Sequence, residues 1–396
     1  MASPTDNQKY EDFLVEVLQA VADSNGDPQV VYPLLQANLD KVDWPLAEAL
    51  RNFAPYRLAA ATPEEAQATA TNIFDFSKLI QQFPLGHREI NLEMAITGYE
   101  IALSVLTREA FPFEWARAQN NRGVVYLDRI LGSKAENIEM AIAGCKAALE
   151  VWTRAAFPQY WASAQNNLGI AYQNRIRGSK AENIELAIAY YNAALEVHTR
   201  KAFPGNWAIV KNGIGNAYNY RILGSKAENI EQAIACFQAA LEVLTRAAFP
   251  QYWASAQNNL GIAYRNRIRG DKAENIELAI ASYQAALEVR TRTAFPDDWA
   301  TTQIGLAAVY SDRIRGEKAE NIELAIACFQ AALAVYTRQA FPENWAMVQN
   351  GMGLAYWNRI RGEKAENIEQ AIASYQATLE VRTRTAFPDD WATTQH

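Results

Sequence analysis

The sequence predicts an all-α protein, a right-handed α-solenoid of helical hairpins with a helical cap at its N-terminal end. Two observations support this prediction. A Phe-Pro pair, with Trp four residues after the Phe, recurs every 46 residues from Phe111 to Phe387 without insertion or deletion. Between these pairs, small and apolar residues recur at helical spacing. A fixed period of this length is typical of a solenoid, in which each unit packs on its neighbours.

The unit that begins at Phe157 shows how each element is predicted. Pro158 suits the first turn of a helix, because its missing N–H would have no partner there. This first helix, helix A, is expected to end before Gly178. Ser179 in a capping box, or alternatively Asn183 as N-cap, would then begin a second helix, helix B. Each unit is therefore predicted to be a hairpin of two helices.

Small residues predict how helices A and B pair. Gly169 lies in the middle of helix A, where Gly is about 1 kcal/mol less favourable than Ala. We expect another backbone to come close at this position. Ala187 and Ala194 lie seven residues apart on one face of helix B and offer a matching surface. Tyr172 and Tyr191 are expected to fill the space around the contact.

These features resemble the tetratricopeptide repeat family. The matching residues are Leu168, Gly169, Tyr172, Ala187, Tyr191, Ala194 and Pro204. The usual repeat has 34 residues, so both connections of the 46-residue unit would be extended by six. HEAT or armadillo repeats match the length of the unit better, at about 40–47 residues. The Gly-x-Ala-Tyr and Ala-x-x-x-aromatic-x-x-Ala-Leu spacings nevertheless favour the tetratricopeptide family.

The first part of the chain lacks the repeat. Residues 1–62 are predicted to form a helical N-terminal cap, with helices from about Gln8 to Asp23, after Pro28 and after Pro45. Such a cap shields the end of a solenoid's apolar core.

The repeats are expected to follow without interruption. Residues 63–110 are predicted to be a degenerate zeroth repeat, in which Ser77 replaces the glycine of helix A. Six 46-residue repeats should then occupy residues 111–386. Residues 387–396 would begin a further repeat that is truncated, so we expect the native protein to continue.

Composition and charge exclude several classes of function. The chain has 396 residues with 37 basic and 44 acidic side chains, a formal net charge of −7. This balance argues against a general nucleic-acid binder or a protein of anionic membrane surfaces. No apolar run approaches about 18 residues, and no signal peptide opens the chain. We therefore predict a soluble, cytoplasmic protein that binds neither nucleic acid nor membrane.

Catalytic and metal-binding patterns are not found in the sequence. The three histidines, His87, His198 and His396, occupy unrelated positions of the repeat. The three cysteines (Cys145, Cys236 and Cys328) do not form a disulfide framework and are expected to be free thiols in the core or on helix surfaces. We predict that the protein is not an enzyme and has no cofactor and no metal site.

Some positions hardly change between repeats. Trp161, Tyr172, Arg175, Thr199 and Arg200 recur in the full units and are expected to serve stacking, or a ladder of contacts along the solenoid. The recurring glutamates of helix B, such as Glu182 and Glu185, are expected to form ion pairs between units.

The resemblance implies a partner-binding face, because helix A lines the concave groove of tetratricopeptide arrays. One helix A position holds an amide in five repeats: Asn120, Asn166, Asn212, Asn258 and Asn350. Amides both donate and accept, which suits binding to an extended peptide main chain. Alternatively, these residues cap loops or bond to the next helix. Tyr220, Arg265 and Trp357, at more variable neighbouring positions, are predicted to select the partner's side chains, whereas Arg290 and Tyr336 are expected on the convex side.

The Phe-Pro-x-x-Trp-Ala and Lys-Ala-Glu-Asn-Ile-Glu segments also resemble the repeat arms of cyanobacterial proteins associated with a caspase-like CHAT protease domain. The resemblance implies a recognition and regulatory arm. We predict a protein–protein interaction scaffold that binds a protein or peptide. The alternative is a self-assembling structural solenoid, which would stack head to tail into dimers or filaments.

Overall fold

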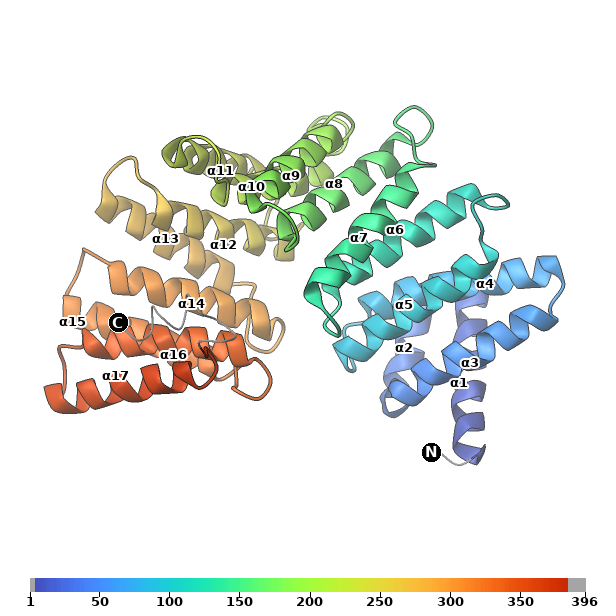
Figure 1. The fold of residues 1–396 in the computed structure, drawn as a ribbon, viewed down its shortest axis with the longest axis horizontal. Helices are drawn as coiled ribbons and strands as arrows, with labels where there is room; N and C mark the ends of the chain where they lie inside the picture. Colours follow the sequence, from blue (N-terminus) through green and yellow to red (C-terminus); the bar gives the residue numbers. More distant parts are fainter. Residues whose placement is uncertain (1–3, 384–396) are drawn as a thin grey trace. The chain divides into compact units, whose positions relative to one another are not determined.

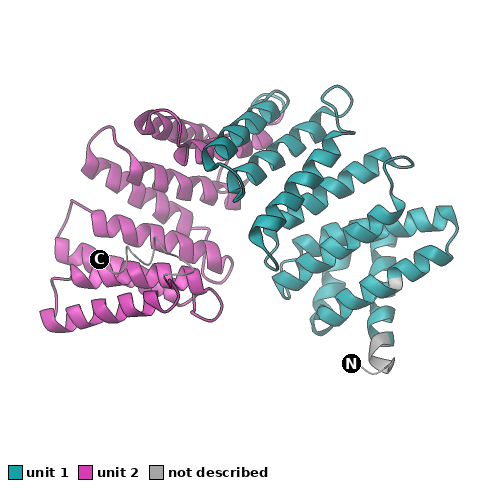
Figure 2. Ribbon diagram, in the orientation of Figure 1, with its two compact units in different colours: residues 1–202 teal, residues 203–396 magenta. Residues whose placement is uncertain are grey.

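The computed structural model describes residues 4–383, which form seventeen α-helices and one short 3₁₀-helix (Figure 1). Consecutive helices pack as antiparallel hairpins, so the predicted class, a TPR-like α-solenoid, is confirmed. The chain divides into two compact units, residues 1–202 and residues 203–396 (Figure 2). Each unit has its own set of packed hairpins.

The first unit begins with helices that lack the repeat. They are α1 (Pro4–Ser24), α2 (Pro28–Ala37), the 3₁₀-helix η1 (Leu39–Lys41) and α3 (Trp44–Ala60). Asp27 begins α2 by accepting a hydrogen bond from the Gln29 N–H at 2.8 Å. Helices α1 and α3 pack on the first hairpin, α4–α5. Where a cap ends and repeats begin stays a prediction from the sequence.

Three hairpins complete the first unit. They are α4–α5 (Pro63–Gln82 and Arg88–Val105), α6–α7 (Pro112–Asp128 and Lys134–Leu149) and α8–α9 (Pro158–Asn174 and Lys180–Leu195). Thr62 and Glu65 form a complete capping box at the start of α4. Each later A helix has Pro in its first turn, as the sequence predicts.

The second unit consists of four hairpins. They are α10–α11 (Pro204–Asn219 and Lys226–Leu241), α12–α13 (Pro250–Asn266 and Lys272–Leu287), α14–α15 (Pro296–Asp312 and Lys318–Leu333) and α16–α17 (Pro342–Trp357 and Lys364–Leu379). The truncated repeat predicted at residues 387–396 lies outside the described residues.

The contact between helices A and B differs from the predicted one. A Cβ added at Gly169 would lie 2.6 Å from the ring of Tyr191, so this glycine makes room for an aromatic ring and not for a backbone. Among the described hairpins, the backbone comes close where Cys145 replaces the ring. There a Cβ at Gly123, the equivalent of Gly169, would lie 3.0 Å from the carbonyl oxygen of Ala141, and one at Gly144 would lie 2.6 Å from that of Gln119. The predicted close backbone contact is therefore wrong for α8–α9 and right for α6–α7.

A buried asparagine holds the turn between helices A and B. Asn183 donates from Nδ2 to the carbonyl oxygen of Arg177 at 2.9 Å, and Gly178 adopts a positive φ of 79° within the same turn. The N-cap of α9 is Ser179, whose hydroxyl accepts from the Glu182 N–H at 3.4 Å. Asn183 therefore lies in the first turn of α9 and its side chain holds the preceding turn, so its role as a rival N-cap is wrong.

A ladder of ion pairs joins successive hairpins within each unit. Arg175 donates to both carboxylate oxygens of Glu139 in the preceding repeat, at 2.8 and 3.1 Å. This guanidinium also lies 5.5 Å from the ring centroid of Tyr172. The other members are Arg129–Glu93, Arg267–Glu231, Arg313–Glu277 and Arg359–Glu323. The predicted ladder is confirmed, and it explains why this Arg and this Tyr recur.

The turn between one repeat and the next is held by a second recurring pair. The Thr199 hydroxyl accepts a hydrogen bond from the Ala202 N–H at 3.2 Å. The arginine that follows reaches the next repeat, as in the ion pair between Arg154 and Glu196. Equivalent ion pairs are Arg108–Glu150, Arg246–Glu288 and Arg338–Glu380. Constant side chains therefore fix both turns of the repeat.

Candidate functional site

The A helices form a layer in each unit. Helix α6 contacts α8 in the first unit, and α10, α12, α14 and α16 contact one another in order in the second. Figure 1 shows α12, α14 and α16 side by side. All the residues predicted to bind a partner lie on A helices, except Tyr220, which directly follows α10.

Three of the five predicted amides are engaged inside this layer. Asn120 accepts from Asn167 Nδ2 at 3.1 Å, Asn212 from Asn259 Nδ2 at 3.4 Å, and Asn258 from the Thr302 hydroxyl at 3.1 Å. Each bond joins one A helix to the next, which is the structural alternative left open by the sequence. No such bond involves Asn166 or Asn350 within the described residues, and both are half-buried. Whether any of the five binds a partner stays a prediction.

The three predicted specificity residues have different surroundings. Tyr220 and Trp357 lie at the C-terminal ends of α10 and α16, and are 52% and 64% exposed. Arg265 is only half-exposed, because its Nε lies 3.1 Å from a carboxylate oxygen of Asp312 on α14. The two aromatic side chains are thus available at the surface, whereas Arg265 joins neighbouring A helices.

One variable position of helix A also serves the hairpin itself, a role that the sequence reading missed. Gln173 accepts a hydrogen bond from the Tyr191 hydroxyl at 3.2 Å. In the next repeat Phe237 has no hydroxyl, and the buried amide of Asn219 at the equivalent position has no hydrogen-bond partner. Gln173 therefore serves the α8–α9 hairpin, whereas Asn219 makes no equivalent bond in α10–α11.

A buried position just after helix B holds different residues at different junctions between repeats, with Leu at two of them. Its residues are Leu106, Trp152, His198, Leu244, Arg290 and Tyr336. Arg290 is 7% exposed and Tyr336 is fully buried. Their expected place on the convex side is wrong, because this position points between successive repeats and not to solvent.

Aromatic rings fill the junction after α7. Trp152 is buried, with its ring centroid 5.0 Å from that of Tyr160 and 6.2 Å from that of Phe113. Phe157 completes the cluster, 5.2 Å from Phe113.

The junction after α13 instead contains a buried arginine beside a cavity. Arg290 donates to the Thr302 hydroxyl at 3.0 Å and to the Ser255 hydroxyl at 3.2 Å. A carboxylate oxygen of Asp298 lies 3.4 Å from its Nη2. Burial lowers the pKa of this guanidinium. The cavity has a volume of about 200 Å³ and is lined by Gln251, Tyr252, Ser255, Val289, Arg290, Phe295 and Asp298.

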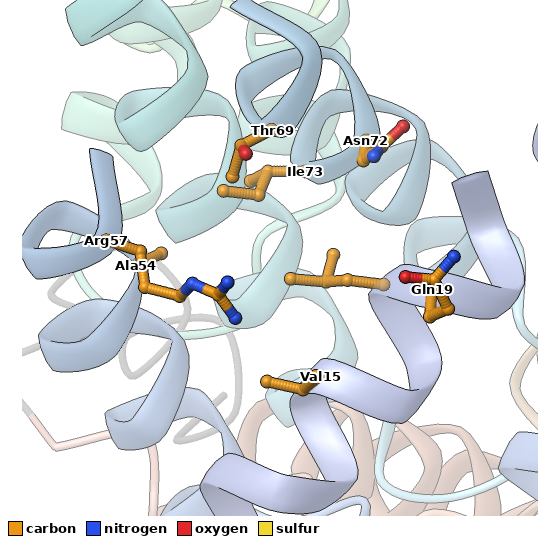
Figure 3. A pocket seen from close by; sticks show the side chains of 8 residues that line it. Val15, Gln19, Ala54, Arg57, Thr69, Asn72 and Ile73 are labelled. Carbon is orange, nitrogen blue, oxygen red and sulfur yellow. The ribbon is translucent and has the colours of Figure 1, made fainter. Parts of the chain in front are cut away.

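A second pocket lies among the first helices (Figure 3). Its volume is about 130 Å³, and its apolar part includes Val15 and Ile73. The Arg57 guanidinium and the amides of Gln19 and Asn72 come from α3, α1 and α4 respectively (Figure 3). This combination could hold a small polar group.

The described residues contain free cysteines but no candidate metal site. They contain no group of three or more His, Cys, Asp or Glu side chains arranged to hold a metal ion. All three cysteines are free, and burial raises the pKa of the Cys145 thiol to about 12 and that of Cys328 to about 11. These thiols are poor nucleophiles at neutral pH. No helix in the described part of the chain has the length and apolar character needed to span a bilayer.

Comparison with known proteins adds one family match. The family model of the tetratricopeptide repeat matches residues 253–296, which include most of α12 and all of α13. The chain resembles a tetratricopeptide repeat array. No curated protein sequence matches it. Among solved structures, a chain in the crystal structure of the APC/C hetero-tetramer Cut9–Hcn1 is similar over 98% of this chain and 96% of that chain. The sequence identity is 14% and the TM-score is 0.32.

Proposed function

We propose that this protein is a scaffold that binds a peptide or protein partner on its layer of A helices. The repeat match and the TPR-like fold support a role in protein–protein interaction in general. The observation that carries the choice of face is the exposure of Tyr220 and Trp357 at the ends of A helices. Exposed aromatic side chains of this size often anchor interfaces, because their burial by a partner is strongly favourable.

The amides then divide into two groups. Asn166 and Asn350 are proposed to bond to the partner's main chain, since their donors and acceptors remain available. Asn120, Asn212 and Asn258 already bond to the next A helix, so their main role is to hold the layer together. Arg265, paired with Asp312, would contribute to binding only if that pair opens.

Selection of short peptides on the immobilised full chain tests this proposal. Peptides enriched on wild type should bind the Tyr220→Ser/Trp357→Ser double variant at least about tenfold more weakly, as expected for aromatic anchors. Tyr56→Ser is the matched control, because Tyr56 is an aromatic residue of α3 that is 75% exposed and lies outside the A layer. Equal binding by all three proteins would contradict the proposed face.

The proposed role is non-catalytic and requires no cofactor or metal. We further propose that the array acts in the cytoplasm as a recognition arm, as its resemblance to CHAT-associated repeat proteins implies. The net charge of −7 supports protein partners over nucleic acid or anionic membranes.

A second candidate, self-assembly, is supported by the last described hairpin. Ile372 on α17 is 42% exposed, whereas the equivalent Ile188, Ile234, Ile280 and Ile326 are 5–8% exposed. Leu354 and Trp357 on α16 are exposed as well. We propose for this candidate that a hairpin of a second copy packs on this surface as a following hairpin packs within the chain, head to tail.

Sedimentation of the full chain at several concentrations distinguishes the two candidates. Head-to-tail assembly predicts a mass that grows with concentration and returns to the monomer in Ile372→Glu. The scaffold proposal predicts a concentration-independent mass. Ile188→Glu is unsuitable as a control because that side chain is buried, so Ile176→Glu, an exposed turn residue, is used instead.

A further inference from the structure

Arg290 differs from the other arginines that join repeats. It is 7% exposed, yet its hydrogen bonds go to two neutral hydroxyls, those of Thr302 and Ser255. Its contact with Asp298 is long, at 3.4 Å, and that carboxylate is half-exposed. By contrast, Arg313 in the ladder meets both oxygens of its Glu partner at 2.8 Å. The only ion pair of this buried charge among the described residues is long and goes to a half-exposed carboxylate, with Asp297 as a further acidic neighbour, so the guanidinium is poorly compensated and can accept a closer anion.

The space beside Arg290 arises from three substitutions relative to the junction after α7. Arg290 stands at the position of Trp152, Gln251 at that of Phe113, and Asp298 at that of Tyr160. The rings are absent, and a cavity of about 200 Å³ remains. Its walls include Val289 and Phe295, at the positions of Val151 and Phe157, and Tyr252, where the first junction has Glu114. The site therefore combines an apolar wall with a buried donor of fixed geometry.

We propose that this cavity binds a carboxylate group carried on an apolar stem. A guanidinium presents a planar pair of N–H donors that matches the two oxygens of a carboxylate, and such pairs strengthen when water is excluded. The incoming group replaces Asp298, whose side chain is 55% exposed and can turn to solvent. The carboxylate belongs either to an acidic side chain or to a chain end of a partner. This site goes beyond the proposed function, because it is separate from Tyr220 and Trp357 and is tested without a partner.

Two further observations support a dedicated site. The Thr302 hydroxyl accepts from Arg290, and its one proton is within hydrogen-bond distance of Asn258 Oδ1 at 3.1 Å and of the Asp298 main-chain oxygen at 2.8 Å, so the cavity adjoins the layer of A helices. In the other full repeats the Thr302 position holds Ala or Val. The fourteen residues 290–303 also recur letter for letter at 382–395. The chain therefore contains the sequence of Arg290, Asp298 and Thr302 twice.

Ligand-observed NMR titration of the full chain tests the proposal with four capped amino acids. Acetyl-glutamate amide carries a side-chain carboxylate, and acetyl-leucine carries a terminal one. Acetyl-glutamine amide and acetyl-leucine amide are their neutral counterparts. We expect at least one acid to bind on the order of tenfold more tightly than its neutral counterpart, because the charged pair is the stronger one. Binding of the first acid alone identifies a side chain as the source, and binding of the second alone identifies a chain end.

Three variants locate the binding. Arg290→Leu should abolish the preference for the acid, and it is compatible with folding because Leu106 and Leu244 occupy the same position in other repeats. Asp298→Asn should tighten binding several-fold by removing a competing carboxylate. Arg292→Leu removes the same charge at an exposed site and should leave binding unchanged. Equal affinity for acids and amides, or an unchanged preference in Arg290→Leu, would overturn the proposal, as would an equal loss in Arg292→Leu.

Discussion

The junction after α7 and the junction after α13 share one backbone turn but differ in what fills it. In both, a Thr hydroxyl accepts a hydrogen bond from the N–H three residues on, at 3.2 Å: Thr153 from Ala156, and Thr291 from Ala294. The residue just before that Thr is Trp152 in an aromatic cluster in the first case, and Arg290 beside a cavity in the second. Constant groups fix the turn, so the buried position next to it is free to vary.

The two junctions have the same turn, but one is filled for stability and the other leaves room for a ligand. The aromatic junction has apolar surface packed on both sides, which favours folding. The polar junction lacks that apolar packing and contains the buried guanidinium of Arg290. Functional sites are commonly less stable than the structure around them. The two junctions can therefore be compared directly by substitution.

The largest expected effect is at the aromatic junction. Trp152→Ala should lower the free energy of unfolding by about 3–5 kcal/mol, because a buried ring is removed and its neighbours cannot fill the space. Urea denaturation followed by circular dichroism measures the loss. Arg290→Ala is the matched substitution and should cost less, since its site already contains a cavity. A similar loss in both variants would show that the two junctions are energetically alike.

Replacing the buried charge of Arg290 by Leu is expected to change the free energy of unfolding in the opposite direction. Arg290→Leu should leave the free energy of unfolding unchanged or raise it, by up to about 4 kcal/mol, as found when apolar side chains replace buried ion pairs. The same denaturation experiment applies. A clear loss of stability would mean that Arg290 is required for packing, and the contrast with Trp152 would disappear.

The shared turn should respond equally in both places. Thr153→Ala and Thr291→Ala each remove the hydrogen bond that holds the turn and should each lower stability by about 1 kcal/mol. Thr291→Ala also removes an exposed contact with the Thr293 hydroxyl at 3.3 Å, which should add little. Thermal unfolding of both variants beside wild type provides the comparison. Unequal losses would indicate that the residue after helix B alters the turn, contrary to the view that the turn is a constant frame.

The smallest expected effect is the pH dependence of stability that comes from the arginine–glutamate ladder in each unit. Hydrogen bonds from arginine lower the pKa of Glu139 and Glu277 below the ordinary value of 4.5. A carboxylate with a lowered pKa in the folded state adds stability above the unfolded pKa, and this contribution is lost as the pH falls through the folded value. The unfolding temperature should therefore drop as the pH falls below about 4.5. Glu139→Gln and Glu277→Gln should reduce that drop by similar amounts.

The sequence predicted the regular part of the molecule because the repeat shows it several times. Pro158 and Gly178 punctuate the helices as expected, and the recurrence of Arg175 indicated the ladder. The 46-residue period does not reveal which side chain or backbone atom a given residue contacts. Gly169 was expected beside a backbone and lies against the Tyr191 ring, because a glycine makes room for either.

The candidate site was harder to predict for the same reason. A constant amide, such as Asn258, suits both a ligand and the next helix, and only its distance to Thr302 reveals the second role. Arg290 and Tyr336 were expected on the convex side, and both are buried. The position of Arg290 after helix B is apolar or aromatic in most other repeats, and that departure was the available signal.

The ladder has a consequence for how such a chain could change in length. Each ladder arginine lies 36 residues after its glutamate, in the following repeat. A duplication or deletion of 46 residues in the gene, wherever it begins inside the array, would therefore leave every interior arginine facing a glutamate. Lineages could gain or lose repeats by unequal recombination without creating an unpaired charge. The number of repeats could then change with the size of the partner that the array binds.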